Sequence, residues 1–429
     1  MNVMGNIVVQ VCDRLHCQRL SATVTNTRTS GFLNHLAQNP NTDLRVMVSS
    51  LFALCPVAHL ATLDAVNRAS EHIDESARRG HDQALTERAI ALEGMMETLR
   101  VLLTDGSALL KIRPQIESFR LLGSARTELM RITPILLELG RHPLEDWTNN
   151  PELAQKINEA HLIIERALSP IRHVMVEDIF GATPGEFAHS VTSLFDAREW
   201  FKSHKGIVSA LGEHLLKSPL FSATVSSPML PYPGYECAMD KLGDELYWRL
   251  KNEPGFDMAP VWQGAPHLTG AIVRQSKHPF LDELIHQHGF NEFTLVMARL
   301  VDLDRTFTQV DSRLNSFELT PIQTIETEPE KGGAIALTQT ARGLLAYAKG
   351  MKGACKAQPF YGVISPTEWQ FSPGGPGQQA VTSALWALSL RESKPTDEQL
   401  QQTVKEALFG LDACVPVSIT RLNDMAENE

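Results

Sequence analysis

Two cysteines near opposite ends of the chain carry the clearest potential for chemistry. Cys55 lies in the run LCPVAH, which ends at His59, and Cys414 lies in the run LDACVPV near the C-terminus. Free thiols at these positions can serve a metal if the fold brings them together. Taken alone, Cys55 and His59 are more typical of a packing pair, because residues four apart share one face of a helix.

Composition excludes several classes of function. The chain has 429 residues with a net charge of −11, which argues against a nucleic-acid partner, because phosphate contacts need clustered Lys and Arg. The sequence contains no run of about eighteen apolar residues, so we expect no membrane span. The first twenty residues lack the basic start and apolar stretch of a signal peptide, so we expect a cytoplasmic protein. The six cysteines are few and irregularly spaced, which does not suggest a disulfide framework.

Periodicity predicts a mainly α protein with small β elements (α+β). Residues 6–30 alternate apolar and polar side chains, as in a half-buried hairpin. Residues 43–68 have helical spacing, with Asp43 as a candidate N-cap and Pro56 at a kink or a helix start. Further helices are expected over the following stretches: 82–103, 107–141, 151–175, 184–216, 278–289, 292–317 and 397–410.

We expect one structural unit, 1–429, with four regions that follow the chain. These are an N-terminal β region (1–42), a helical bundle (43–217), an irregular connection rich in Pro, Ser and Gly (218–268), and a C-terminal helical and β part that closes the site (269–429).

Five short blocks, in order, resemble the large subunit of nickel–iron hydrogenases. They are the two cysteine runs, GAPHLTGAIVR (264–274) with the later ALR (298–300), TARGLL (340–345) and SPTEWQFSP (365–373). Each block alone is a weak signal, but their common order makes chance an unconvincing explanation. The region 70–215 resembles the family only in being helical. The resemblance implies a hydrogenase large-subunit-like fold.

The resemblance implies roles for four residues. In that family, thiolates hold an iron ion that carries two cyanides and one CO. By position, Cys55 matches a bridging, iron-binding thiolate and His59 the histidine that supports it. Arg342 matches an arginine beside the cyanides, and Thr367 matches a hydroxyl that donates to a cyanide nitrogen. Without the resemblance, Arg342 also fits a surface cation and Thr367 a turn residue.

The second iron thiolate is left open between two cysteines. Cys414 aligns with a nickel-terminal thiolate of the family, whereas the family's other iron thiolate falls on Val417. Either Cys414 turns to the iron or Cys17 supplies the ligand. The neighbouring His16 stands where the family has a proton-relaying glutamate.

The departures from the family imply a degenerate metal site. Phe52 and Val417 stand where each cysteine pair would have its partner thiol, which removes much of the nickel ligand set. Gln339 replaces an acid, and Tyr347 and Thr420 replace histidines. We therefore expect no nickel and no enzymatic turnover of hydrogen.

The nearest resemblance is to hydrogenase maturation proteins of the HupK/HoxV type. It implies a cytoplasmic scaffold that transiently holds an Fe(CN)2CO fragment. Proteins of the maturation complex would donate the fragment, and the hydrogenase large-subunit precursor would accept it. Two alternatives remain: a metal-free structural relative within a redox complex, like the quinone-site subunit of complex I, or a divergent catalytic hydrogenase subunit. The retained cysteines argue against the first, and Phe52 and Val417 argue against the second.

Overall fold

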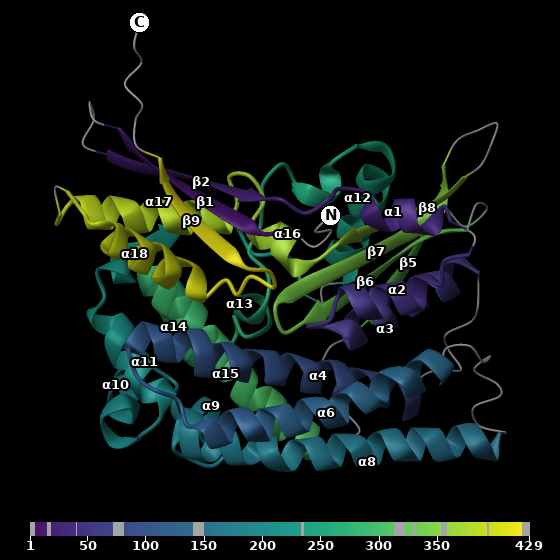
Figure 1. The fold of residues 1–429 in the computed structure, drawn as a ribbon, viewed down its shortest axis with the longest axis horizontal. Helices are drawn as coiled ribbons and strands as arrows, with labels where there is room; N and C mark the ends of the chain where they lie inside the picture. The colour runs from purple at the N-terminus through teal and green to yellow at the C-terminus, as the bar shows by residue number, and fades with distance from the viewer. Residues whose placement is uncertain are drawn as a thin grey trace, which may run out of the picture.

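Long helices lie beneath two β-sheets in the computed structural model (Figure 1). The structure describes residues 5–14, 19–39, 41–71, 81–139, 150–232, 236–312, 322–328, 332–352, 358–392 and 394–422. The helices are α1 (Phe32–Ala37), α2 (Leu44–Leu51), α3 (Pro56–Ser70), α4 (His81–Val101), α5 (Ser107–Leu110), α6 (Ile116–Leu139), α8 (Pro151–Val174), α9 (Glu186–Ser190), α10 (Leu194–Ser203), α11 (Ile207–Lys217), α12 (Glu236–Asn252), α13 (Ala271–Arg274), α14 (Pro279–His288), α15 (Glu292–Asp311), α16 (Pro366–Gln370), α17 (Pro376–Ser389) and α18 (Asp397–Phe409). The strands are β1 (Ile7–Arg14), β2 (Arg19–Asn26), β3 (Thr224–Val225), β4 (Phe290–Asn291), β5 (Ile322–Glu328), β6 (Gly333–Thr340), β7 (Gly343–Lys352), β8 (Gln358–Ile364) and β9 (Val417–Leu422).

Helices α4, α6 and α8 form a layer along one side of the molecule (Figure 1). In α8, the buried side chains recur three and four residues apart, as in Ile164, Leu168 and Ile171, and so form one apolar stripe. This stripe packs against α6 and α4. The candidate site described below lies against this layer.

Strands β5, β6, β7 and β8 form an antiparallel sheet in that order. Nearly every residue of β6 is buried, because α3 covers one face of the sheet and α12 covers the other. A strand that is covered on both faces buries successive side chains alike, so its sequence does not alternate between apolar and polar residues. The tight turn between β6 and β7 carries Arg342.

The first and last strands of the described chain lie side by side. The second sheet has the order β2-β1-β9, with β1 and β2 antiparallel and β1 and β9 parallel. Ile7 of β1 is opposite Val417 of β9. This pairing anchors the end of the loop between α18 and β9, which carries Cys414.

Several sequence predictions are confirmed. The chain is α+β, residues 6–30 contain the β1–β2 hairpin, and α3 begins at Pro56. Asp43 is the N-cap of α2, where its side chain accepts from the amides of Arg45 and Val46. No helix in the part of the chain that the structure describes is long and apolar enough to span a membrane.

The prediction of an irregular connection over 218–268 is wrong in its centre. Helix α12 occupies residues 236–252 and packs against the four-stranded sheet. Its buried residues Met239, Leu242, Leu246 and Leu250 have helical spacing. The Pro-, Ser- and Gly-rich residues that precede the helix obscured this pattern.

Candidate metal-binding site at Cys55 and Cys414

The residues that the sequence singled out converge on one cavity. Cys55, His59, Arg342, Thr367 and Cys414 all line it, and its volume is about 30 Å³. They come from the start of α3, the β6–β7 turn, the start of α16 and the loop after α18. The fold thus brings together groups almost 360 positions apart in sequence.

Two candidate residues lie outside the described part of the chain. Cys17 and His16 fall in the gap between 14 and 19, so their proposed ligand and relay roles stay predictions.

Cys55 is the half-buried N-cap residue of α3, and the carboxyl group of Glu93 in α4 lies beside it. Glu93 accepts hydrogen bonds from the backbone amides of Val57 (2.8 Å) and Ala58 (3.0 Å), the first free donors of the helix. Burial raises the pKa of Glu93 to about 8 in spite of these donors. Burial, with Glu93 adding to it, also raises the pKa of the Cys55 thiol well above its usual value. Both groups therefore favour their protonated forms.

His59 is buried one turn further along α3. Its ring stacks on Phe52, with ring centroids 3.5 Å apart and planes 10° apart, and its Nδ1 shares a hydrogen bond with the Tyr347 hydroxyl (2.8 Å). Burial, reinforced by the nearby Arg28, lowers the pKa of His59 well below its usual range, so the imidazole is neutral. Phe52, at the position of a family thiol, is thus a packed core side chain.

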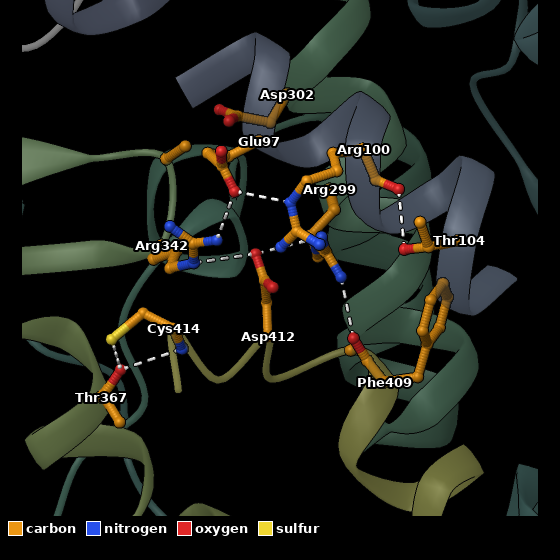
Figure 2. A network of polar contacts seen from close by, with 12 residues as sticks. Glu97, Arg100, Thr104, Arg299, Asp302, Arg342, Thr367, Phe409, Asp412 and Cys414 are labelled. Atoms are coloured by element: carbon orange, nitrogen blue, oxygen red, sulfur yellow. Dashed lines mark hydrogen bonds and ion pairs between the residues drawn. The ribbon is translucent and has the colours of Figure 1, made fainter. Parts of the chain in front are cut away.

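Cys414 and Thr367 contact each other through two hydrogen bonds (Figure 2). The Thr367 hydroxyl oxygen accepts from the backbone amide of Cys414 (3.3 Å) and lies 2.8 Å from its sulfur. Since the oxygen accepts from the amide, its own hydrogen is available to the sulfur. Burial raises the pKa of Cys414, and both Arg342 and Thr367 act in the opposite direction.

Arg342 is held by two carboxylates from distant segments (Figure 2). Its Nη2 donates to Glu97 of α4 (3.3 Å), and its Nε pairs with Asp412 (3.3 Å). Asp412 also pairs with Arg299 of α15 (3.2 Å). Neither contact uses Nη1, so one edge of the guanidinium remains for the cavity.

Charge around Arg342 keeps it ionised. Burial alone would lower its pKa, but the carboxylates of Asp412 and Glu97 act in the opposite direction, and the pKa is raised. The cavity therefore contains a charged guanidinium that can donate hydrogen bonds beside two thiols, and its charge is balanced by Glu97 and Asp412.

Close packing of α4 against the β6–β7 turn holds Arg342 beside the cavity. A Cβ added at Gly94 of α4 would lie 2.6 Å from the Cβ of Ala341, the residue before Arg342 in the turn. Only glycine lets α4 and the turn pack this tightly. The same packing puts Glu93 and Glu97 beside the cavity.

A buried ion pair supports the opposite wall. Arg28 donates to Glu368 (2.7 Å) and to Ser365 (3.0 Å), and both side chains of the pair are almost fully buried. Glu368 also completes the capping box of α16. The Arg28 guanidinium lies over the Phe52 ring, 4.9 Å from its centroid.

A second, larger pocket lies on the other side of the Cys414 loop. We call it the outer pocket: it has a volume of about 650 Å³ and is bordered by α4, α5, α18 and the start of β9. Leu54 and Cys414 line both the outer pocket and the inner cavity, so they form the partition between them.

The donor set is small for a metal. Among the residues that the structure describes, no group of three or more His, Cys, Asp or Glu has metal-binding geometry. Two thiols leave most positions of an iron ion unfilled, so such an ion must bring ligands of its own.

The sequence did not identify Glu93, Glu97, Asp412 or Arg28 as part of the site. A signal existed for two of them, because Glu93 and Glu97 are charged residues four apart on an otherwise apolar face of α4. Asp412 lies two residues before Cys414 and takes a left-handed backbone conformation (φ 50°), which is rare outside glycine.

Comparison with known proteins shows the fold. No family model and no curated protein matches the chain. Its structure is similar to that of an NAD⁺-reducing [NiFe]-hydrogenase in the H2-reduced state, with a TM-score of 0.51, 12% identity, and coverage of 92% of this chain and 93% of that one. It is also similar to the Ni-Fe-Se hydrogenase from Desulfomicrobium baculatum, with a TM-score of 0.51, 12% identity, and coverage of 94% and 95%. The predicted hydrogenase large-subunit-like fold is confirmed.

Proposed function

We propose that this protein is a non-catalytic scaffold of nickel–iron hydrogenase maturation, of the HupK/HoxV type. It holds an Fe(CN)2CO fragment through Cys55 and Cys414 and passes it to the hydrogenase large-subunit precursor. The observation that carries the proposal is the cavity itself, where two thiols face Arg342 and Thr367 in a large-subunit-like fold.

The chemistry of the cavity fits this cargo. Thiolates are soft ligands that suit low-spin iron, and the two cyanides are hydrogen-bond acceptors for the Arg342 guanidinium and the Thr367 hydroxyl. Both thiols have raised pKa values in the metal-free chain. Binding the fragment therefore releases protons, and its affinity rises with pH.

The dimensions favour a loosely held fragment. The inner cavity of about 30 Å³ has room for a water or two, which is less than an iron ion with three diatomic ligands requires. The fragment therefore sits at the partition formed by Leu54 and Cys414 and extends into the outer pocket. Exposure on that side lets it leave again.

The replaced thiols support a role without nickel or turnover. Phe52 is buried under the His59 ring, and Val417 is 39% exposed at the start of an edge strand. Neither side chain can supply the sulfur ligand that nickel requires. A scaffold with fewer ligands than a hydrogenase binds its cargo less tightly, as transfer requires.

The proposal includes partners and a compartment. Proteins of the hydrogenase maturation complex donate the fragment, the large-subunit precursor accepts it, and the exchange takes place in the cytoplasm. Neither nucleic acid nor a membrane is a partner.

Complementation in cells tests the role. In a strain that lacks this protein, Cys55→Ser and Cys414→Ser should each abolish maturation of the hydrogenase that depends on it. Cys12→Ser, at a half-buried cysteine on β1, is the matched control and should restore maturation. Normal maturation with both Cys55→Ser and Cys414→Ser would refute the scaffold.

A further inference from the structure

We infer that Arg274 and Asp302 are positioning residues for Arg342. They hold the β6–β7 turn so that the guanidinium of Arg342 faces the cavity. The inference rests on the proposed function, in which Arg342 donates to a cyanide of the fragment. It is carried by a buried ion pair whose remaining hydrogen bonds end on the backbone of the turn.

Arg274 ends α13 and forms a buried, bidentate ion pair with α15. Its Nε donates to one oxygen of Asp302 (2.9 Å) and its Nη2 donates to the other (2.6 Å). The two side chains are only 6% and 11% exposed, and the side-chain amide of Gln275 donates to Asp302 as well (2.8 Å). Two parallel hydrogen bonds fix the plane of the guanidinium, which a point charge such as that of lysine cannot do.

The other hydrogen bonds of Arg274 end on the turn itself. Its Nη1 donates to the carbonyl of Thr340, and its Nη2 also donates to the carbonyl of Ala341 (2.8 Å). These are the two residues directly before Arg342. The carbonyl of Ala341 belongs to the planar peptide unit that ends at the Cα of Arg342, so its direction sets where that side chain leaves the turn. Arg274 therefore orients Arg342 through the backbone and does not itself line the inner cavity.

The segment before α13 packs against the same turn. A Cβ added at Gly270 would lie 2.7 Å from the carbonyl oxygen of Arg342, so only glycine permits this approach. The hydroxyl of Thr269 accepts from the amide of Leu344 (2.8 Å), which follows the turn. The end of the sequence block 264–274 thus holds the turn on both sides of Arg342.

Helix α15 connects this ion pair to the loop that carries Cys414. Arg299 lies one turn before Asp302 on α15 and donates to the carbonyl of Phe409 (2.8 Å), in the segment that leads to Cys414 (Figure 2). Residues three apart share a face of a helix, so α15 reaches both segments from one side. One helix therefore sets the separation between the Arg342 guanidinium and the Cys414 sulfur.

Alkylation of Cys414 in the metal-free, full-length protein tests this positioning. The Arg342 guanidinium stabilises the Cys414 thiolate, which is the reactive form. Arg274→Lys keeps the charge but loses the forked geometry, so the turn and the Arg342 guanidinium should move. Iodoacetamide at pH 8 should then alkylate Cys414 about threefold more slowly than in wild type, relative to Cys12 in the same molecule. Asp302→Asn should have the same effect, and simple loosening of the fold the opposite one, because loosening exposes a half-buried thiol.

Two comparisons show whether Arg274 acts through Arg342. In an Arg342→Gln background, Arg274→Lys should slow alkylation no further, since the charge that it positions is gone. Arg45→Lys is the matched control, because Arg45 also forms a bidentate pair, with Asp64, and donates to a carbonyl, that of Leu136. Arg45 does not line the cavity, so Arg45→Lys should leave the alkylation rate unchanged, although both lysine variants should lower the midpoint of urea unfolding.

The loaded protein provides a spectroscopic readout of the same positioning. If Arg342 donates to a cyanide, its displacement in Arg274→Lys should move one cyanide band of the infrared spectrum. Arg45→Lys should leave every band in place. An unmoved cyanide band in Arg274→Lys would overturn the inference.

The remaining outcomes separate this inference from the scaffold role. Alkylation in Arg274→Lys at the wild-type rate or faster, or equal slowing in the Arg342→Gln background, would overturn the inference. If the wild type carries no iron fragment, the proposed function is refuted and the alkylation rates alone decide whether Arg274 positions Arg342. If the fragment loads and Arg274→Lys behaves like Arg45→Lys, only this inference is wrong.

Discussion

Replacement of Glu93 by glutamine should make the protein more stable at alkaline pH. Glu93 is 2% exposed and accepts two backbone amides at the start of α3, and burial raises its pKa to about 8. The folded chain therefore binds a proton that the unfolded chain has released between pH 4.5 and 8. Stability contributed by this proton is complete below pH 4.5 and is lost as the pH rises through 8.

The size of the effect follows from the two pKa values. A carboxyl group with a pKa of about 8 in the folded chain and 4.5 in the unfolded chain lowers the free energy of unfolding by about 4 kcal/mol as the pH rises from 5 to 9. Glutamine stays neutral over this range and keeps one acceptor for the two amides, at a constant cost of about 1 kcal/mol. Glu93→Gln should thus be slightly less stable than wild type at pH 5 and clearly more stable at pH 9.

Urea unfolding at pH 5, 7 and 9 measures this difference. Glu213→Gln, at a partly exposed residue of α11 that pairs with Lys217, is the control and should follow the wild type at every pH. If Glu93→Gln and the wild type lose stability in parallel between pH 5 and pH 9, Glu93 is ionised in the folded protein and the reasoning is wrong.

Three further predictions concern the walls of the cavity. Gly94→Ala should lower the free energy of unfolding by about 1–3 kcal/mol, because its Cβ meets that of Ala341 at 2.6 Å; Gly123→Ala in α6, where nothing lies within 4 Å, should raise it by about 0.5–1 kcal/mol. Glu368→Ala should cost about 3–5 kcal/mol in urea unfolding, because Arg28 keeps a buried charge without its partner; Glu117→Ala, from an exposed pair, should leave the midpoint unchanged. Thr367→Val should raise the pKa of Cys414 further and slow its alkylation by iodoacetamide at pH 8, measured by mass spectrometry; an unchanged rate would show that the hydroxyl does not donate to the sulfur.

The sequence located the cavity because its thiols and donors lie in short blocks. Cys55, Arg342, Thr367 and Cys414 each belong to a block that resembles one family, and they line one cavity in the structure. Local signals also sufficed for single elements, as with Asp43 and Pro56 at the starts of α2 and α3. Such features depend on neighbouring residues alone.

What the sequence could not predict depends on long-range packing. The pKa of Glu93 is raised only because α4 buries it against α3, and Arg342 is fixed only because Glu97 and Asp412 reach it from segments on either side. The outer pocket likewise exists because β9 pairs with β1 at the other end of the chain. No pattern within one segment encodes these approaches.

Infrared spectroscopy tests the central claim most directly. The protein, purified anaerobically from cells with the full maturation machinery, should absorb in the region of metal-bound cyanide and CO, where protein does not. The bands should persist in Cys12→Ser and disappear in Cys55→Ser and Cys414→Ser. Absence of the bands from the wild type, together with absence of iron, or their persistence in both Cys55→Ser and Cys414→Ser, would contradict the scaffold that we propose.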